Sequence, residues 1–258
     1  MSIEALMEEA REIAETAGAL TLKWYQKNDL EVNYKVDGTE VTEADRAAEA
    51  IMREQLLKRH PGDAVLGEEN GGSFSTSHRT WVIDPIDGTR GFVKGVPLYS
   101  TLLALVDEDG PLVGVIHLPV LGLTMVAGRG EGCWLDDHRC WVSSHPVLDK
   151  ALVNTSSYET FTEKNFERLK KTGAVMRTWG DGYGYFLVAS GRAEAMVDPV
   201  CSVWDLAPIP IIIEEAGGKF SDLLGESALK LDQKANNLNG LATNGLVHKD
   251  LLTTLGKS

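Results

Sequence analysis

The sequence predicts an α+β protein in which helices are layered around two sheets. Three observations lead to this fold class. Residues 3–60 show helical apolar spacing, residues 81–135 contain short apolar runs separated by turns, and residues 151–255 alternate between strand-like and helix-like segments. No internal repeat, low-complexity stretch or long linker interrupts the chain. We therefore expect residues 1–258 to form one unit, with an α+β half at 1–145 and an α/β half at 146–258.

The first sixty residues predict two helices. Apolar residues between positions 3 and 20 recur at three- and four-residue steps, which indicates an amphipathic helix. A second helix is expected to begin near Thr42, because Thr42 and Asp45 have the spacing of a capping box. The segment RHPG at 59–62 is a stop signal for this helix.

The middle of the chain predicts strands. Residues 81–83 (WVI) form a short apolar run typical of a buried strand. Three further apolar runs lie at 100–106, 112–118 and 123–127, and the turn-rich segments between them indicate antiparallel hairpins. The glycine-rich segment at 128–132 reads as another hairpin turn before 133–135.

The C-terminal part alternates between the two types of element. The helix predicted at 204–216 contains Pro208 and Pro210, so it is expected to begin late or to be kinked. We expect strands at 151–155, 175–178, 193–197 and 241–243, and helices at 162–171, 183–190, 204–216 and from 245 onward.

Composition limits the possible functions. With 25 Lys and Arg against 38 Asp and Glu, the net charge is −13, which argues against nucleic-acid or anionic-membrane partners. No apolar run reaches the length of about 20 residues that spans a bilayer. The three cysteines lack CxxC spacing, and the N-terminus lacks a signal pattern, which favours a cytoplasmic location. A phosphate ester could approach so acidic a protein only if divalent cations reverse the local charge.

The segment 81–89 (WVIDPIDGT) carries the strongest chemical signal. A buried strand delivers Asp84 to its end, and Asp87 follows three residues later, so both carboxylates can face one point. Gly88 permits close backbone approach, and Thr89 offers a hydroxyl and an amide. Backbone amides next to hard oxygen ligands suit a phosphate bridged to Mg²⁺. The structural alternative is that the two acids only cap a turn.

Two further acids are candidates for the same site. Glu68 lies in the pair Glu68-Glu69, and we expect only one of the two to face the site, because neighbours in extended chain point apart. Asp205 follows Trp204 near a predicted helix start. Each has a structural reading as well, Glu68 as a solvated surface acid and Asp205 as a helix-capping acid.

The motifs together resemble those of the inositol monophosphatase family. GEE at 67–69, DPIDGT at 84–89, WDLAP at 204–208 and EEAGG at 214–218 carry the resemblance, which extends from residue 37 to the C-terminal helix. It implies a layered α/β/α/β/α sandwich of the inositol monophosphatase and fructose-1,6-bisphosphatase type. It also implies a Mg²⁺-dependent phosphomonoesterase with two or three ions per active site, and a homodimer.

The resemblance also implies roles for single residues. Glu68, Asp84, the carbonyl of Ile86 and Thr89 would surround one metal. Asp84, Asp87 and Asp205 would hold a second, and a third site would share Glu68. Asp45 would accept a hydrogen bond from Thr89 and so help to activate the attacking water, although its capping-box position explains Asp45 equally well. The implied catalytic residues are Glu68, Thr89 and Asp45, and the implied substrate-binding residues are Gly88, Thr89, Asp181, Asp198 and Asp205.

The substrate is indicated by residues 177–185 (RTWGDGYGY). This segment and MVDP at 196–199 resemble the bacterial histidinol-phosphatases of the family, except that Gly182 stands where those proteins more often have Cys. Asp181 and Asp198 could attract the ammonium and imidazole groups of histidinol phosphate. Inositol-1-phosphatase or broad sugar-phosphatase activity is the alternative. Asp181 could also be only a loop or capping acid, and the acidic cluster could belong to a non-catalytic Ca²⁺-binding module.

Overall fold

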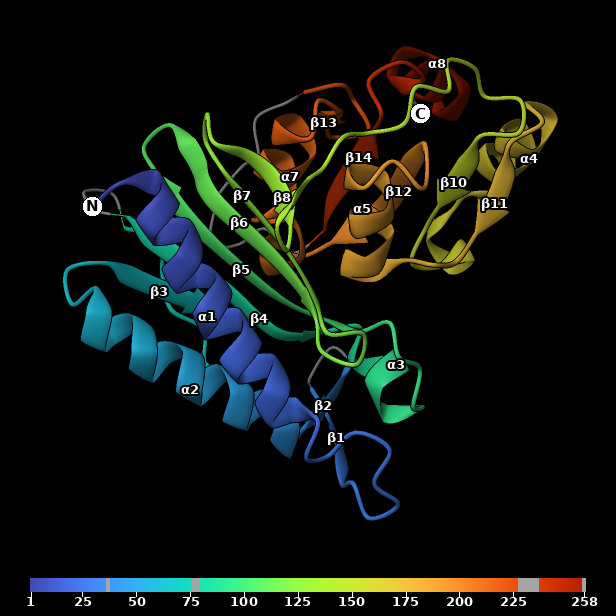
Figure 1. Ribbon diagram of the computed structural model, residues 1–258. Helices are drawn as coiled ribbons and strands as arrows, with labels where there is room; N and C mark the ends of the chain where they lie inside the picture. The colour runs from blue at the N-terminus through green and yellow to red at the C-terminus, as the bar shows by residue number, and fades with distance from the viewer. Residues whose placement is uncertain (36–37, 76–78, 227–236, 257–258) are drawn as a thin grey trace.

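Two sheets, with helices on both faces of each, give the molecule five layers (Figure 1). The computed structural model describes residues 1–35, 38–75, 79–226 and 237–256, so Asp37, where the resemblance begins, lies outside the described residues. Helices α1 (Ile3–Thr21) and α2 (Glu43–Arg59) form the first layer, and α5 (Asp181–Ala189) and α7 (Ile209–Glu215) the central one. Helices α4 (Glu163–Lys171) and α8 (His248–Leu255) form the last.

The first sheet has seven strands and carries the predicted hairpins. Its first two strands pair in parallel and all later neighbours pair antiparallel. The turn predicted at 128–132 joins two of these strands, as expected. In order across the sheet, the strands are β3 (Ala64–Gly67), β4 (Thr80–Asp87), β5 (Ser100–Asp107), β6 (Gly110–Leu118), β7 (Leu123–Gly128), β8 (Gly132–Leu135) and β9 (His138–Arg139).

Helices α1 and α2 cover one face of this sheet. The apolar stripe predicted for the first helix is buried, with Ile13 packed in one cluster with Trp81 and Val113. Burying a side chain such as Ile13 contributes about 1.5–3 kcal/mol. Thr42 and Asp45 form the predicted capping box at the start of α2. Both helix predictions are therefore confirmed.

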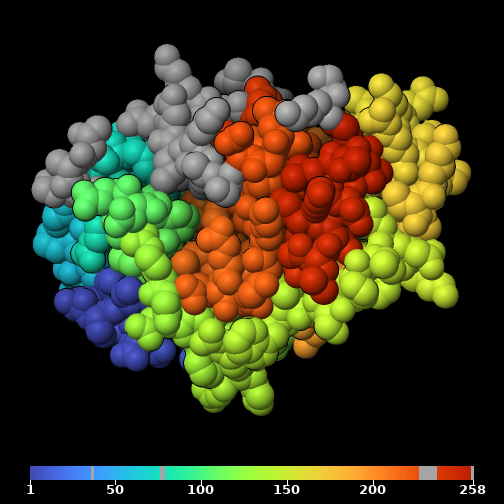
Figure 2. All heavy atoms as spheres, turned by 90° about the horizontal axis from the view of Figure 1, so that it is seen from above, coloured from blue at the N-terminus to red at the C-terminus, as the bar shows by residue number. Residues whose placement is uncertain are grey.

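The second sheet has five strands and belongs to the C-terminal part of the chain. Its order is β11 (Val175–Arg177), β10 (Leu152–Asn154), β12 (Ala195–Cys201), β14 (Leu238–Thr243) and β13 (Lys219–Ser221). Helices α4 and α8 contact each other on its outer face, where the red surface of the last residues adjoins the yellow one in Figure 2. Phe186 and Ile212 fill the space between the sheets.

Two C-terminal helices differ from the sequence prediction. Helix α5 begins at Asp181, two residues earlier than expected, so Asp181 lies inside the first turn and not in the preceding loop. The helix predicted at 204–216 is broken into α6 (Val203–Leu206) and α7, as its two prolines suggested. Pro210 is the second residue of α7, where a backbone N–H would have no helical partner, so its missing donor costs little.

Several short strands were not predicted. Besides β3, β9 and β13, they include β1 (Val32–Tyr34) and β2 (Glu40–Thr42), which form a separate two-stranded sheet. The segments are only two to four residues long, so their sequence is too short to show a strand-like alternation. Among the described residues, no helix has the combination of length and apolar character needed to span a membrane.

Candidate active site

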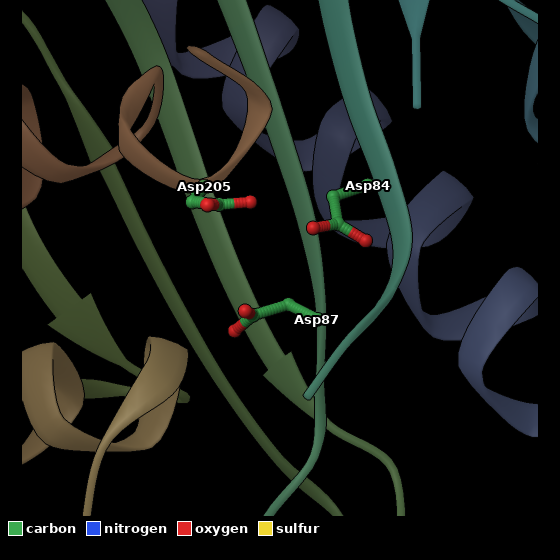
Figure 3. A group of neighbouring side chains, drawn as sticks. All are labelled: Asp84, Asp87 and Asp205. Carbon is green, nitrogen blue, oxygen red and sulfur yellow. The ribbon is translucent and has the colours of Figure 1, made fainter. Parts of the chain in front are cut away.

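Three carboxylates meet in the space between the first sheet and α6. Asp84 and Asp87 come from β4 and Asp205 from α6, and their side chains point toward one another (Figure 3). One oxygen atom of each residue lies within 4.8 Å of the corresponding atoms of the other two. The structure thus brings together three of the acids singled out in the sequence.

The local backbone geometry of β4 directs the side chains of Asp84 and Asp87 toward the same side. The pairing of β4 with β5 is regular up to Asp84 and shifts its register between Asp84 and Asp87. Such an irregularity lets two residues three positions apart face the same side. Gly88 then adopts a left-handed conformation with φ of 86°, which favours glycine, and the short helix α3 (Thr89–Val93) begins.

Asp205 is held by its own helix. Its Oδ2 accepts a hydrogen bond of 2.7 Å from the backbone N–H of Ser202 and so caps α6. Val203 and Trp204 pack against Val82 on β4, which places the start of α6 beside that strand. Capping and membership of the acidic cluster are therefore compatible roles for Asp205.

The cluster is electrostatically unfavourable without a cation. Burial, reinforced by Glu68, Asp87 and Asp205, raises the pKa of Asp84 well above its usual value. Burial, together with Asp181 and Asp205, does the same for the pKa of Asp87. Burial raises the pKa of Asp205 to about 7. Because each group offers only oxygen donors, the cluster has the composition that Mg²⁺ prefers.

Asp45 and Thr89 lie next to this cluster. The Thr89 hydroxyl is 3.2 Å from Asp45 Oδ1 and 2.9 Å from the carbonyl oxygen of Ile86. Asp45 uses its other oxygen, Oδ2, to accept hydrogen bonds from the backbone N–H and hydroxyl of Thr42. Asp45 thus caps α2 with one oxygen and contacts Thr89 with the other, so both interpretations of this residue are compatible.

Glu68 stands beside the cluster and is paired with a lysine. The Lys35 ammonium lies 2.6 Å from Glu68 Oε1 and 2.7 Å from Glu69 Oε1. Both glutamates lie in a turn after β3, not in extended chain, so the expectation that they point apart is wrong. Sequence reasoning missed Lys35, because its role depends on the position of the unpredicted sheet β1–β2.

A small acid-lined cavity adjoins the three carboxylates. Its volume is about 70 Å³. Asp198 lies in its wall and accepts hydrogen bonds from the Ser156 N–H at 3.0 Å and the Tyr185 hydroxyl at 3.1 Å. Burial raises the pKa of Asp198 to about 6. The lining residues are Asp87, Ser156, Asp181, Gly182, Tyr185, Asp198, Val200, Cys201 and Asp205.

Asp181 connects this cavity to the DPIDGT turn. The Asp181 N–H donates to Ser156 Oγ at 2.8 Å, and its Oδ2 lies 2.9 Å from the position that a Cβ on Gly88 would take. The backbone of Asp181 is left-handed, with φ of 54°. Ser156 and Tyr185 were not predicted. The one sequence feature that could have indicated Ser156 is its position directly after the strand predicted at 151–155, because side chains at the ends of neighbouring strands lie close together.

A larger cavity of about 680 Å³ lies between the end of α1 and the start of α2. Lys23, Lys27 and Arg46 line it together with Asp29, Glu31 and Glu43, so its charges are mixed. We place the functional site at the smaller cavity, because only there do carboxylate oxygens converge within the described residues.

Known proteins resemble this chain over nearly its whole length. The inositol monophosphatase family model matches residues 2–257. The histidinol-phosphatase of Chlorobaculum parvum is 42% identical over 231 residues, covering 85% of this chain and 86% of that protein. The histidinol-phosphatase of Mycobacterium tuberculosis is 39% identical over 252 residues, covering 94% and 95%.

Solved structures agree with the sequence relatives. The Thermotoga maritima inositol monophosphatase superimposes with a TM-score of 0.88 at 30% identity, covering 97% of this chain and 96% of that one. This likeness confirms the predicted layered sandwich, and the relatives favour an enzyme over a non-catalytic binding module. The chain therefore belongs to the inositol monophosphatase family and is a phosphoric monoester hydrolase.

Proposed function

We propose that this enzyme hydrolyses L-histidinol phosphate to L-histidinol and phosphate with Mg²⁺ as its cofactor. The observation that carries the proposal is the position of the acid-lined cavity directly beside the three converging carboxylates. The carboxylates supply a place for the cations that a phosphate requires. The acids of the cavity supply a place for the positively charged part of the ester.

The residues proposed to hold metal are Glu68, Asp84, Asp87, Asp205 and the carbonyl of Ile86, for two or three ions. Bound Mg²⁺ would neutralise phosphate charge and make water acidic enough to provide a nucleophile near neutral pH. The raised pKa values of Asp84 and Asp87 support this assignment, since a bound cation would offset both the burial and the repulsion that raise them. For Glu68 to serve, Lys35 would have to give up its contact with Oε1.

Thr89 and Asp45 would orient the attacking water. The Thr89 hydroxyl directs its hydrogen toward Asp45 and Ile86, which leaves its oxygen free to accept a hydrogen from water. Asp45 fixes this direction, and it is itself fixed by Thr42. We propose that the backbone of Gly88 and Thr89, at the start of α3, contacts the phosphate of the substrate.

The negative charges of the cavity would determine which alcohol part of the substrate the enzyme prefers. Histidinol carries an ammonium and an imidazole that can be protonated, whereas inositol is uncharged, so Asp181 and Asp198 would favour histidinol. The identity of about 40% to two histidinol-phosphatases supports this choice. Inositol 1-phosphate remains the second candidate, because the Thermotoga maritima structure of the same fold is an inositol monophosphatase.

A direct comparison of the two esters tests the proposal. With Mg²⁺ present, we expect kcat/KM for histidinol phosphate to exceed that for inositol 1-phosphate by at least about tenfold, the value of one charge-assisted hydrogen bond. Chelation with EDTA should abolish both activities, and added Mg²⁺ should restore them. A higher kcat/KM for inositol phosphate would overturn the substrate assignment but leave the family assignment intact.

We also propose that residues 1–258 act as one catalytic unit, in a cytoplasmic homodimer. In this proposal the half at 1–145 contributes Glu68, Asp84 and Asp87, and the half at 146–258 contributes Asp181 and Asp205. Family resemblance supports the dimer. The three cysteines are free and buried, which supports a reducing compartment.

A further inference from the structure

We propose that Ser100 is a positioning residue for Asp87, and that Ser100 and Gly182 form a matched pair in which neither residue can change alone without disturbing that carboxylate. This inference rests on the proposed function only in treating Asp87 as a metal ligand. It concerns two residues for which the sequence motifs give no role.

Two donors hold the same oxygen of Asp87. The Ser100 hydroxyl donates to Asp87 Oδ2 at 2.6 Å, and the backbone N–H of Gly182 donates to the same atom at 2.5 Å. Ser100 has no exposed surface, so water cannot replace its hydroxyl. Among the hydrogen bonds of the described residues, none involves Asp87 Oδ1. The two donors therefore fix the plane of the carboxylate and leave one oxygen available for a cation.

Glycine is required at position 182 because the neighbouring atoms leave no room for a side chain, and not because of the backbone conformation. Its φ lies outside the left-handed region, so an L-amino acid could adopt the backbone. A Cβ built on Gly182, however, would lie 2.2 Å from Ser100 Oγ and 2.8 Å from Asp87 Oδ2. These distances are well inside van der Waals contact, so any side chain at 182 collides with the hydroxyl that holds Asp87.

The pair also joins the carboxylate cluster to the proposed substrate loop. Gly182 follows Asp181 in the first turn of α5, and α5 contacts β5, the strand that carries Ser100. The loop that would bind the alcohol part of the ester is thus anchored on Asp87. The space that a side chain at 182 would enter already holds Ser100 Oγ.

A double-mutant cycle with Mn²⁺ affinity as its readout tests the pair. Mn²⁺ alone is titrated into the full-length protein, and free Mn²⁺ is followed by electron paramagnetic resonance. Ser100→Ala should weaken Mn²⁺ binding by about tenfold, the usual effect of removing a group that orients a metal ligand. Gly182→Cys should weaken it by about tenfold or more, because the new side chain displaces Ser100 and Asp87.

The double variant distinguishes a matched pair from two independent sites. Independent effects would multiply to about a hundredfold loss. The matched pair predicts that Ser100→Ala/Gly182→Cys binds Mn²⁺ at least as tightly as Gly182→Cys alone, because removing the hydroxyl relieves the closest collision. Gly182→Ala, with the same Cβ, replaces Gly182→Cys if the cysteine variant does not fold.

Ser221→Ala is the matched control for Ser100→Ala. Ser221 is also fully buried, and its hydroxyl lies within hydrogen-bond distance of His248 Nε2, away from the site. A purely structural role for Ser100 would lower the Tm, as is expected for Ser221→Ala, without changing Mn²⁺ affinity. Unchanged Mn²⁺ affinity in Ser100→Ala, or multiplicative losses in the double variant, would overturn the inference. Because no ester is used, neither result depends on which substrate the enzyme hydrolyses.

Discussion

Asp87→Asn is expected to lower kcat/KM by at least about a hundredfold while making the metal-free protein more stable. The amide oxygen of Asn can accept the two hydrogen bonds that Asp87 Oδ2 receives from Ser100 and Gly182. Its NH₂ group would then point toward the other acids, where it cannot act as a metal ligand. Activity is lost because a ligand is lost, although the packing is kept.

The gain in stability follows from the raised pKa of Asp87. In the unfolded chain this pKa is ordinary, near 4, whereas burial raises it in the folded metal-free protein. Between the two values the folded state binds more protons than the unfolded state, so stability falls as the pH rises. At pH 8 the wild-type protein is therefore destabilised by the buried charge of Asp87. Asp87→Asn carries no charge at this position and is not destabilised in this way. Each gain of about 1 kcal/mol corresponds to a Tm higher by roughly 2–4 °C in a protein of this size.

Thermal unfolding in EDTA at pH 5 and pH 8 measures this effect. The difference in Tm between Asp87→Asn and wild type should be large at pH 8 and small at pH 5, where the wild-type acid is closer to being protonated. Saturating Mg²⁺ should raise the Tm of the wild type more than that of the variant. The exposed Asp137 provides a control, since Asp137→Asn should change neither quantity. Hydrolysis by Asp87→Asn at the wild-type rate would contradict the proposal that Asp87 is a metal ligand.

Asp181→Asn is expected to change substrate preference. Loss of the negative charge should lower kcat/KM for histidinol phosphate by about 10–100-fold, the value of a charge-assisted hydrogen bond of about 1.5–3 kcal/mol. Hydrolysis of inositol 1-phosphate should fall much less, because the uncharged ring gains little from a carboxylate. Asn is the suitable replacement because Asp181 has a φ of 54°, which Asn tolerates and β-branched Thr does not.

Steady-state kinetics with both esters measures this preference. Asp136→Asn is a matched control, because Asp136 also has a positive φ, of 50°, and lies on the exposed β8–β9 turn. It should leave both values of kcat/KM unchanged. Equal losses for the two esters in Asp181→Asn would contradict charge recognition and indicate that Asp181 only supports the start of α5.

Local sequence patterns predicted the elements that carry the cluster. The strand at 81–83 and the apolar runs that follow it have strong periodicity, and DPIDGT directly follows that strand, so Asp84, Asp87 and Gly88 could be assigned to one segment. The strand itself extends further than predicted, because β4 continues to Asp87. Asp205 could be joined to them only through the resemblance to a family, because nothing in its own neighbourhood indicates which strand it approaches.

The remaining contacts depend on tertiary packing. Ser100 reaches Asp87 through the register of β5 against β4, and Lys35 reaches Glu68 from the position directly after β1, a strand too short to recognise. The left-handed backbone of Asp181, which starts α5 two residues early, has no signal in the sequence, because Asp-Gly also occurs in ordinary turns. The Ser100 and Tyr185 hydroxyls and the Lys35 ammonium were missed for this reason, although they hold Asp87, Asp198 and Glu68.

A crystal structure with Mn²⁺, phosphate and L-histidinol bound would show the metal site and the acid-lined cavity together. We expect anomalous density for Mn²⁺ bonded to Asp84, Asp87 and Asp205, with phosphate beside it at the start of α3. We also expect a nitrogen atom of histidinol within about 3 Å of a carboxylate oxygen of Asp181 or Asp198. Mn²⁺ bound away from these three carboxylates, or histidinol bound outside the acid-lined cavity, would contradict the proposed function.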